Sequence, residues 1–327
     1  MSGQPDRDLR FPDFYIAGHQ KCGTTALYLT LAERDDVFLP QVKEPKYFAT
    51  ELRSVLHREG EVNPLHTEAG YLALYADARP GQLRGDASPQ YLRSRAAPGL
   101  IAERRPDAKL IAIFREPADF LRSFHQQMLS SRVEDVTDLR RALELEDERR
   151  AGREIPRGCH LPMSLYYSEH VRYAEQLGRL RENFPPENIH VIIYDDLKSD
   201  PQGTMSAVVE FLGLPPGERE VAMRRTKPLQ QARSSGLHRF AGELRRAKRR
   251  PESVGTAARV AGAVIPERLL DSGARNAFRR VAYTRPEQPD AQLAAELRAR
   301  FAPEVAQLGA MIDRDLGALW GPNGNPS

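Results

Sequence analysis

The feature that most constrains the fold is a junction near the N-terminus, where an apolar run leads directly into a glycine-bearing loop. The run covers residues 14–17, the loop GHQKCGTT covers 18–25, and helical spacing continues over 24–33. In such a junction backbone N–H groups and the positive end of a helix dipole point at one place, and the loop lysine adds a charge. The junction predicts an anion site. A plain strand-to-helix turn, in which the glycines serve packing, is the alternative.

Further apolar runs alternate with helical patterns along most of the chain. The runs lie at 14–17, 82–85, 110–114 and 189–194, and three of the four have the composition of buried strands. Helical patterns cover residues 118–129 and 167–184, among others. This alternation predicts an α/β fold with a P-loop-type parallel sheet and helices on both faces. Because no internal repeat or linker interrupts it, we expect a single domain over residues 10–320.

The C-terminal third differs from the rest in composition. Between Arg224 and Arg250 there are ten lysine or arginine residues and one acid, Glu243. We expect residues 224–290 to form a basic, irregular, lid-like insertion. A three-and-four apolar spacing over 291–319 then predicts a last helix, which Pro303 kinks or interrupts. The predicted domain thus carries a C-terminal basic and helical extension.

Composition excludes several classes of protein. The 327 residues are 40% hydrophobic, with 48 Lys+Arg against 45 Asp+Glu, a net charge of +3 and two cysteines. That charge does not indicate a nucleic-acid partner, and no apolar run is long enough to span a membrane. The N-terminus lacks the apolar stretch of a signal peptide. We therefore expect a cytoplasmic protein with no nucleic acid partner and no transmembrane segment.

The loop differs from the nucleotide loop of ATPases and kinases. In that loop a serine or threonine follows the lysine directly and holds Mg²⁺, whereas Cys22 follows Lys21 here. The histidines also lack the spacing of metal ligands, so no metal site is predicted. Two other function classes remain alternatives: a P-loop NTPase or kinase-like phosphotransferase, with 191–196 as its metal-binding strand, and a non-enzymatic anion-binding module that uses the basic segment 224–250.

Two motifs carry a family resemblance. The pattern Gly18-x-x-Lys21-x-Gly23-Thr24-Thr25 resembles the 5′-phosphosulfate loop of sulfotransferases that use 3′-phosphoadenylyl sulfate (PAPS). Arg115-x-Pro117, with Ser123 eight residues after the arginine, resembles the 3′-phosphate motif of the same family. A guanidinium and a hydroxyl so placed can both reach one phosphate. The resemblance implies that the cofactor contacts Gly18, Lys21, Cys22, Gly23, Thr24, Thr25, Arg115, Ser123 and, on a weaker Arg-Ser match, Arg233.

Two further segments are similar to the heparan-sulfate-sulfotransferase-like branch of that family and its bacterial relatives. Residues 43–48, KEPKYF, resemble its Lys-Glu-Pro-x-aromatic-Phe segment, and residues 86–92, DASPQYL, resemble its acidic-x-Ser-Pro-x-Tyr segment. Ala87 stands where the branch usually has a lysine, and the animal enzymes' C-terminal disulfide has no counterpart. These departures argue against a glycosaminoglycan acceptor. They leave the reaction class unchanged.

The resemblance also implies the chemistry. PAPS would give its sulfuryl group to a hydroxyl or amine of a saccharide, lipid or small metabolite, with Lys21 stabilising the leaving phosphate and Glu44 acting as general base. Glu44 paired with a neighbouring lysine is the alternative, and His19, His125 and His160 are the other candidate bases.

Other positions have two interpretations each. Tyr91 and Tyr167 resemble aromatic residues that line the cleft, but single tyrosines more often pack as half-buried residues. Arg115 is either a phosphate ligand or an ion-pair partner of Glu116 or Asp119 at a helix start. The basic segment 224–250 attracts acidic acceptors or an anionic membrane surface, or is a solvated helix end.

Overall fold

The computed structural model describes residues 10–53, 63–216, 231–232, 283–284 and 290–321. Its centre is a five-stranded sheet in which every neighbouring pair is parallel, as the strand alternation predicts. The order across the sheet is β2 (Val37–Phe38), β3 (Leu83–Asp86), β1 (Phe14–Ile16), β4 (Lys109–Phe114) and β5 (Ile189–Ile193). The prediction of an α/β fold is therefore confirmed.

The middle of the sheet is the core of the molecule. In β1 every side chain is fully buried, and in β4 all but the first are. Residues buried on both faces need helices on both faces, which explains why these strands are continuous apolar runs rather than alternating ones. The edge strand β2 was not predicted. It has only two residues, and it is defined by its pairing with β3 rather than by its composition.

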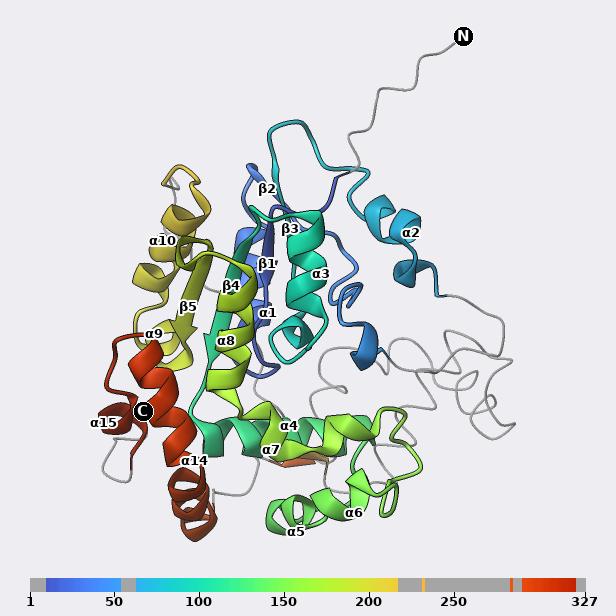
Figure 1. Ribbon diagram of the computed structural model, residues 1–327, viewed down its shortest axis with the longest axis vertical. Coiled ribbons are helices and arrows are strands. Elements are labelled where there is room, and N and C mark those ends of the chain that lie inside the picture. The colour runs from blue at the N-terminus through green and yellow to red at the C-terminus, as the bar shows by residue number, and fades with distance from the viewer. Residues whose placement is uncertain (1–9, 54–62, 217–230, 233–282, 285–289, 322–327) are drawn as a thin grey trace, which may run out of the picture.

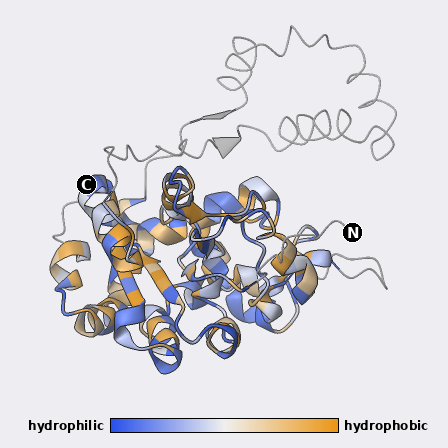
Figure 2. Ribbon diagram, turned by 90° about the horizontal axis from the view of Figure 1, so that it is seen from above, coloured by the Kyte–Doolittle hydropathy of each residue, from blue (hydrophilic) through white to orange (hydrophobic). Residues whose placement is uncertain are grey.

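Helices cover both faces of the sheet. Figure 1 shows α3 (Ala97–Arg104) and α8 (Tyr173–Asn183) in front of the strands. α1 (Thr24–Leu31) connects β1 to β2, and this connection crosses the sheet in the direction opposite to those through α3 and α8. Because such crossovers are right-handed, α1 lies on the other face of the sheet. α4 (Pro117–Ser131) runs across the carboxyl ends of the strands. In Figure 2 the helices around the strands carry both hydrophobic and hydrophilic segments, as expected of helices that have one face on the sheet and one in solvent.

The remaining elements are short or lie at the periphery. They are the α-helices α2 (Glu68–Ala73), α5 (Leu139–Glu144), α6 (Glu146–Arg150), α7 (Tyr167–His170), α9 (Tyr194–Ser199), α10 (Pro201–Leu212), α14 (Ala291–Met311) and α15 (Leu316–Trp320), the antiparallel pair β6 (Gln231–Ala232) and β7 (Tyr283–Thr284), and the 3₁₀ turns Thr50–Leu52, Pro64–His66, Pro89–Tyr91, Pro162–Leu165 and Pro186–Asn188. Within the described ranges no helix combines the length and apolar character that crossing a membrane requires.

The structure corrects two helix predictions. The helical pattern 167–184 is two helices, because the chain turns at Val171 and Arg172. The turn buries Tyr173 so that its hydroxyl donates to the Arg115 carbonyl, at 2.8 Å. Pro303 lies inside α14 without ending it, and the break comes after Met311. Buried residues on both sides of the proline, Phe301 and Val305, keep the helix in place despite the lost hydrogen bond.

Candidate functional site

The site lies at the carboxyl end of the two central strands. From β1 the chain continues through α1 to the β2 edge, whereas from β4 it continues to β5 at the other edge. Ligands of open parallel sheets bind at such a switch point, where the loops of neighbouring strands part. Residues 18–23 follow β1 and Arg115 follows β4, so the two sequence motifs meet at this point.

The loop after β1 folds tightly against α1 and α9. Gly23 has a φ of 84°, and a Cβ at this position would lie 2.5 Å from Leu197 Cδ2. Gly18 packs against Thr24, whose Cγ2 would lie 2.9 Å from an added Cβ. Both positions therefore need glycine, one for its backbone conformation and its close packing and the other for space alone.

The loop and the first turn of α1 present unused donors. No side chain caps the helix, and the N–H groups of Lys21, Gly23, Thr24 and Thr25 donate to no residue in the described part of the chain. Free N–H groups at a helix N-terminus attract anions, and the helix dipole adds to that attraction. The local backbone thus fits the predicted 5′-phosphate site.

Arg115 joins the two motifs. Its Nη1 donates to the carbonyl of Lys21 at 2.9 Å, and its guanidinium lies over the ring of Tyr194, 4.7 Å from the centroid. Nη2 is 3.6 Å from Asp119, while Glu116 caps α4 through two backbone N–H groups. Nε is buried and has no partner in the described structure. An orphaned guanidinium donor beside an anion loop fits a second phosphate.

Ser123 lies on the face of α4 that is turned toward the loop. Four residues before it, Asp119 approaches Arg115, and four residues after it Gln127 Nε2 donates to Gln20 at 3.3 Å. Residues four apart share one helix face, so Ser123 lies between these two contacts. Its side chain is half-buried and makes no hydrogen bond within the described part of the chain.

Burial sets the charge states in the loop. The pKa of Lys21 is lowered, first by burial and then by the Arg115 guanidinium. The Cys22 thiol is fully buried, and burial raises its pKa to about 12. Its N–H already donates to the His19 carbonyl. The predicted cofactor contact of Cys22 is therefore limited to its backbone.

Glu44 belongs to another segment, which contacts the first turn of α1 through Lys43. Its Oε1 lies 3.5 Å from Lys43 Nζ, and Lys43 Nζ donates to the Thr25 hydroxyl in the first turn of α1. Gln90 Nε2 approaches Glu44 Oε2 at 3.4 Å. Lys43 is a site residue that sequence reasoning missed. It was visible only as a possible ion-pair partner of Glu44, and nothing in its spacing indicated the contact with Thr25.

Asp86 is linked through Ser88 to the segment that carries Glu44. The fully buried carboxylate accepts hydrogen bonds from the hydroxyls of Tyr71, Ser88 and Tyr91, each at 2.7 Å, and Ser88 Oγ accepts from the Lys46 N–H at 3.1 Å. Burial raises the pKa of Asp86 to about 6. Tyr91 is thus a buried support of the site and does not line its cavity.

A cavity of about 330 Å³ opens beside the loop. Its walls include residues 18–20, Lys46, the α4 side chains Phe124 and Met128, parts of 158–164, and three residues of one turn, Pro89, Gln90 and Arg93. Since Gln90 touches both this cavity and Glu44, the cavity lies next to the predicted base. It is large enough for a small organic molecule.

The candidate histidines differ in their environment. His19 borders the cavity, but its ring is buried, its Nε2 lies 2.7 Å from Gln176 Oε1, and burial lowers its pKa to about 3. His125 is buried against the Val136 carbonyl, and burial lowers its pKa too. His160 is exposed and lines the cavity. It is the histidine best placed to replace Glu44 as the base.

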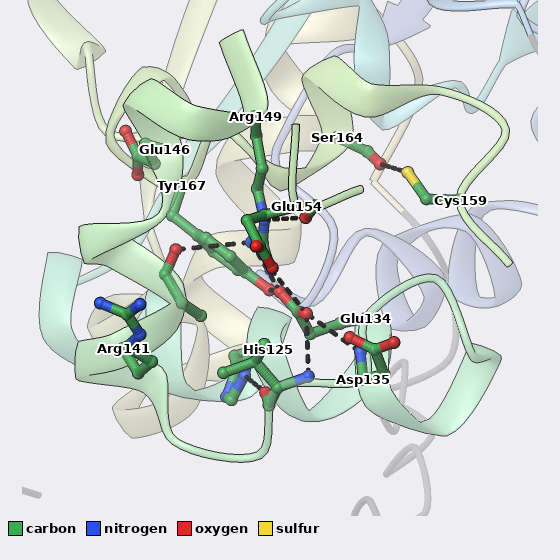
Figure 3. A network of polar contacts seen from close by, with 12 residues as sticks. His125, Glu134, Asp135, Arg141, Glu146, Arg149, Glu154, Cys159, Ser164 and Tyr167 are labelled. Carbon is green, nitrogen blue, oxygen red and sulfur yellow. Dashed lines mark hydrogen bonds and ion pairs between the residues drawn. The ribbon is translucent and has the colours of Figure 1, made fainter. Parts of the chain in front are cut away.

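A buried polar network lies behind the cavity residue Val133 (Figure 3). The Arg149 guanidinium donates two hydrogen bonds of 2.8 Å to Glu134, and the Tyr167 hydroxyl donates to the same carboxylate at 2.9 Å. Arg149 Nε also donates to the Glu154 carbonyl. Tyr167 is therefore part of this network rather than of the cavity lining. Through Arg149, the network connects Glu134, which follows the cavity residue Val133, to Glu154, which precedes the cavity residues in 158–164.

Arg233 and the basic segment 224–250, apart from the two residues of β6, lie outside the described residues, as does most of the predicted lid-like insertion 224–290. Their predicted roles, a cofactor contact and an acceptor-side surface, stay predictions.

A family model and one solved structure agree with this architecture. A family model described as "Sulfotransferase domain" matches residues 11–237. A crystal structure of a sulfotransferase from Alicyclobacillus acidocaldarius has the same fold, with a TM-score of 0.64 and 22% identity over 94% of this chain and 98% of that one. Mouse sulfotransferase SULT7A1, solved with PAP, is 15% identical over 96% and 89% of the two chains, with a TM-score of 0.45. No curated protein matches the sequence.

Proposed function

The chain belongs to the sulfotransferase domain family, a family of PAPS-dependent enzymes, and we propose on that premise how its own residues divide the reaction. PAPS supplies the sulfuryl group when bound. The residues around the loop would bind it, and those around the cavity would bind the acceptor. The observation that carries the proposal is the direct contact between the two motifs, from Arg115 Nη1 to the Lys21 carbonyl.

The nucleotide side would hold two phosphates. The free N–H groups of 21–25 and the Lys21 ammonium would bind the 5′-phosphate, and Arg115 with Ser123 would bind the 3′-phosphate. Lys21 would also stabilise the negative charge that develops on the leaving phosphate, so it serves both binding and turnover.

The acceptor side would move a proton. Glu44 would take the proton from an acceptor hydroxyl or amine as that atom attacks sulfur. Lys43, which contacts both Glu44 and Thr25, would hold the carboxylate at the edge of the phosphate loop. Lys43 is thus a positioning residue in this proposal.

The finer family assignment rests on the same segments. Residues 43–48 and 86–92 meet through the bond from the Lys46 N–H to Ser88, and both resemble segments of the heparan-sulfate-sulfotransferase-like branch. We therefore propose that the chain is a bacterial-type relative of that branch, with residues 10–320 as one sulfotransferase domain.

Turnover with the authentic donor tests the proposal. The full chain would be incubated with PAPS and a panel of hydroxyl and amine acceptors, and products would be analysed by mass spectrometry for the gain of one sulfuryl group. We expect transfer by the wild type and none above background by Lys21→Ala. Mg²⁺-dependent turnover of ATP, with no transfer from PAPS, would contradict the proposal and favour a phosphotransferase.

A further inference from the structure

The cavity beside the phosphate loop has an uneven charge. Two cations line it, Lys46 and Arg93, whereas no aspartate or glutamate is among its lining residues in the described part of the chain. Neither cation forms an ion pair with a described residue. The other walls include apolar side chains, with Phe124, Met128 and Val133 on one side.

Arg93 is the more informative of the two cations. Its Nη1 donates to the Met163 carbonyl at 2.9 Å, and the structure shows no other hydrogen bond from its guanidinium among the described residues. Burial lowers its pKa to about 10, so it stays charged at neutral pH. The same charge helps to lower the pKa of buried His170, which also lines the cavity. Glu169 and Glu51 act on this half-buried charge only at a distance and form no ion pair with it, so an anionic ligand in the cavity would offset more of its desolvation cost.

From this arrangement we infer that the cavity binds an acceptor with an apolar body and one carboxylate or equivalent oxyanion, which pairs with Arg93. The inference rests on the proposed function, because it assigns the cavity to the acceptor. The apolar walls would hold the body, and the free donors of Arg93 would bind the oxyanion through a forked contact. A cavity of this volume suits a small molecule.

The placement also orients the acceptor. Gln90 and Arg93 lie on the same turn, and Gln90 contacts Glu44. An acceptor anchored at Arg93 would therefore direct its other end toward Glu44 and the loop at 18–20. The acidic group would select the acceptor, and the hydroxyl or amine at the far end would react.

Matched ligands test the inference. Isothermal titration calorimetry of the full chain saturated with PAP would compare para-hydroxyphenylpropanoate with its methyl ester, which lacks the negative charge and adds one methyl group, and with its primary amide, which lacks the charge at nearly the same size. We expect the acid to bind at least about tenfold more tightly, the scale of one charge-assisted hydrogen bond. In Arg93→Met the ratio should fall to about one. In Arg95→Met, an exposed arginine two residues away, it should stay at the wild-type value.

A purely structural Arg93 gives a different pattern. If the guanidinium only holds the Met163 carbonyl, Arg93→Met would weaken acid and ester equally, and that result overturns the inference. Arg93→Lys keeps the charge and should retain part of the preference for the acid. Equal binding of acid and ester by the wild type, including no binding of either, overturns it as well.

The test separates this inference from the proposed function. PAP affinity, measured in the same titrations, reports on the nucleotide side, and Arg93→Met should leave it unchanged. A protein that binds PAP but shows no preference for the acid contradicts only the inference. A protein that prefers the acid but binds no PAP contradicts the proposed function.

Discussion

The two sides of the phosphate loop are built in different ways. On the nucleotide side, the groups come from two strand-to-helix junctions, 18–25 and 115–123, and their positions follow from local backbone geometry. On the acceptor side, the cavity walls come from segments far apart in sequence, and buried carboxylates hold them together. Asp86 holds Tyr91, in the turn that carries Gln90 and Arg93, and Glu134, next to Val133, holds Arg149.

This difference shows what each side tolerates. The nucleotide side depends on glycine backbone and free N–H groups, which need little help from the rest of the fold. The acceptor side depends on buried charges whose partners must stay in place, because an unpaired buried charge is strongly destabilising. Substitutions in the two regions should therefore fail in different ways, and the predictions below begin with the largest expected effect.

Breaking the Glu134–Arg149 pair should cost the most stability. Both side chains are fully buried, so Arg149→Met leaves an uncompensated carboxylate and should lower the free energy of unfolding by about 3 to 5 kcal/mol in urea titrations. Arg141→Met removes an exposed partner of Glu144 on the nearby helix α5 and should cost less than about 1 kcal/mol.

The double variant Glu134→Leu with Arg149→Met sharpens this prediction. It removes both charges, so it should recover much of the stability that Arg149→Met loses. A double variant no more stable than the single one would show that the ion pair is not the source of the cost. PAP affinity of the folded double variant should match the wild type, because the network lies on the acceptor side.

Asp86 should make stability depend on pH with a definite sign. Its folded pKa of about 6 lies above the ordinary value of 3.8, so the folded state holds the proton more tightly and this group's contribution is lost as pH rises between those values. The shift corresponds to roughly 3 kcal/mol. The stability deficit of Asp86→Asn relative to the wild type should therefore shrink by this order from pH 4 to pH 7, in urea titrations at matched pH. A deficit that grows with pH would contradict the assignment.

Removing the carboxylate of Glu44, the proposed base, should affect turnover alone. Glu44→Gln keeps the shape of the side chain, so PAP affinity should stay within about twofold while kcat falls by about a hundredfold or more. Glu103→Gln, an exposed acid on α3, serves as the control and should change neither. Near-normal turnover in Glu44→Gln, with loss of turnover in His160→Ala, would move the base to the histidine.

The smallest expected loss of stability comes from replacing either of two glycines that share a positive φ. Gly23 and Gly81 have φ values of 84° and 82°, but a Cβ would meet Leu197 at Gly23 and nothing within 4 Å at Gly81. Gly81→Ala should cost about 1 kcal/mol for the left-handed conformation, and Gly23→Ala should cost about 1 kcal/mol more because of the close contact. Equal costs in thermal unfolding would show that the packing of the loop against α9 adds nothing.

The same contrast explains what sequence reasoning could reach. The strand-to-helix junctions are short in sequence, so the spacing of Lys21, Gly23 and Arg115 was enough to place them, and the parallel sheet followed from strand alternation. The turn at Val171 and the role of Lys43 depend on contacts with distant segments, the Arg115 carbonyl and Thr25. The cavity could not be predicted either, since Arg93 belongs to no motif and Met163, whose carbonyl accepts its hydrogen bond, lies 70 residues away.

The most direct test of the account is a comparison of two nucleotides. PAP and ADP would each be titrated by calorimetry into the metal-free full chain and into Arg115→Ala. If Arg115 and Ser123 bind the 3′-phosphate, PAP should bind the wild type at least about tenfold more tightly than ADP, and Arg115→Ala should reduce that ratio toward one. Equal affinity for the two nucleotides, or binding that requires Mg²⁺, would contradict the account.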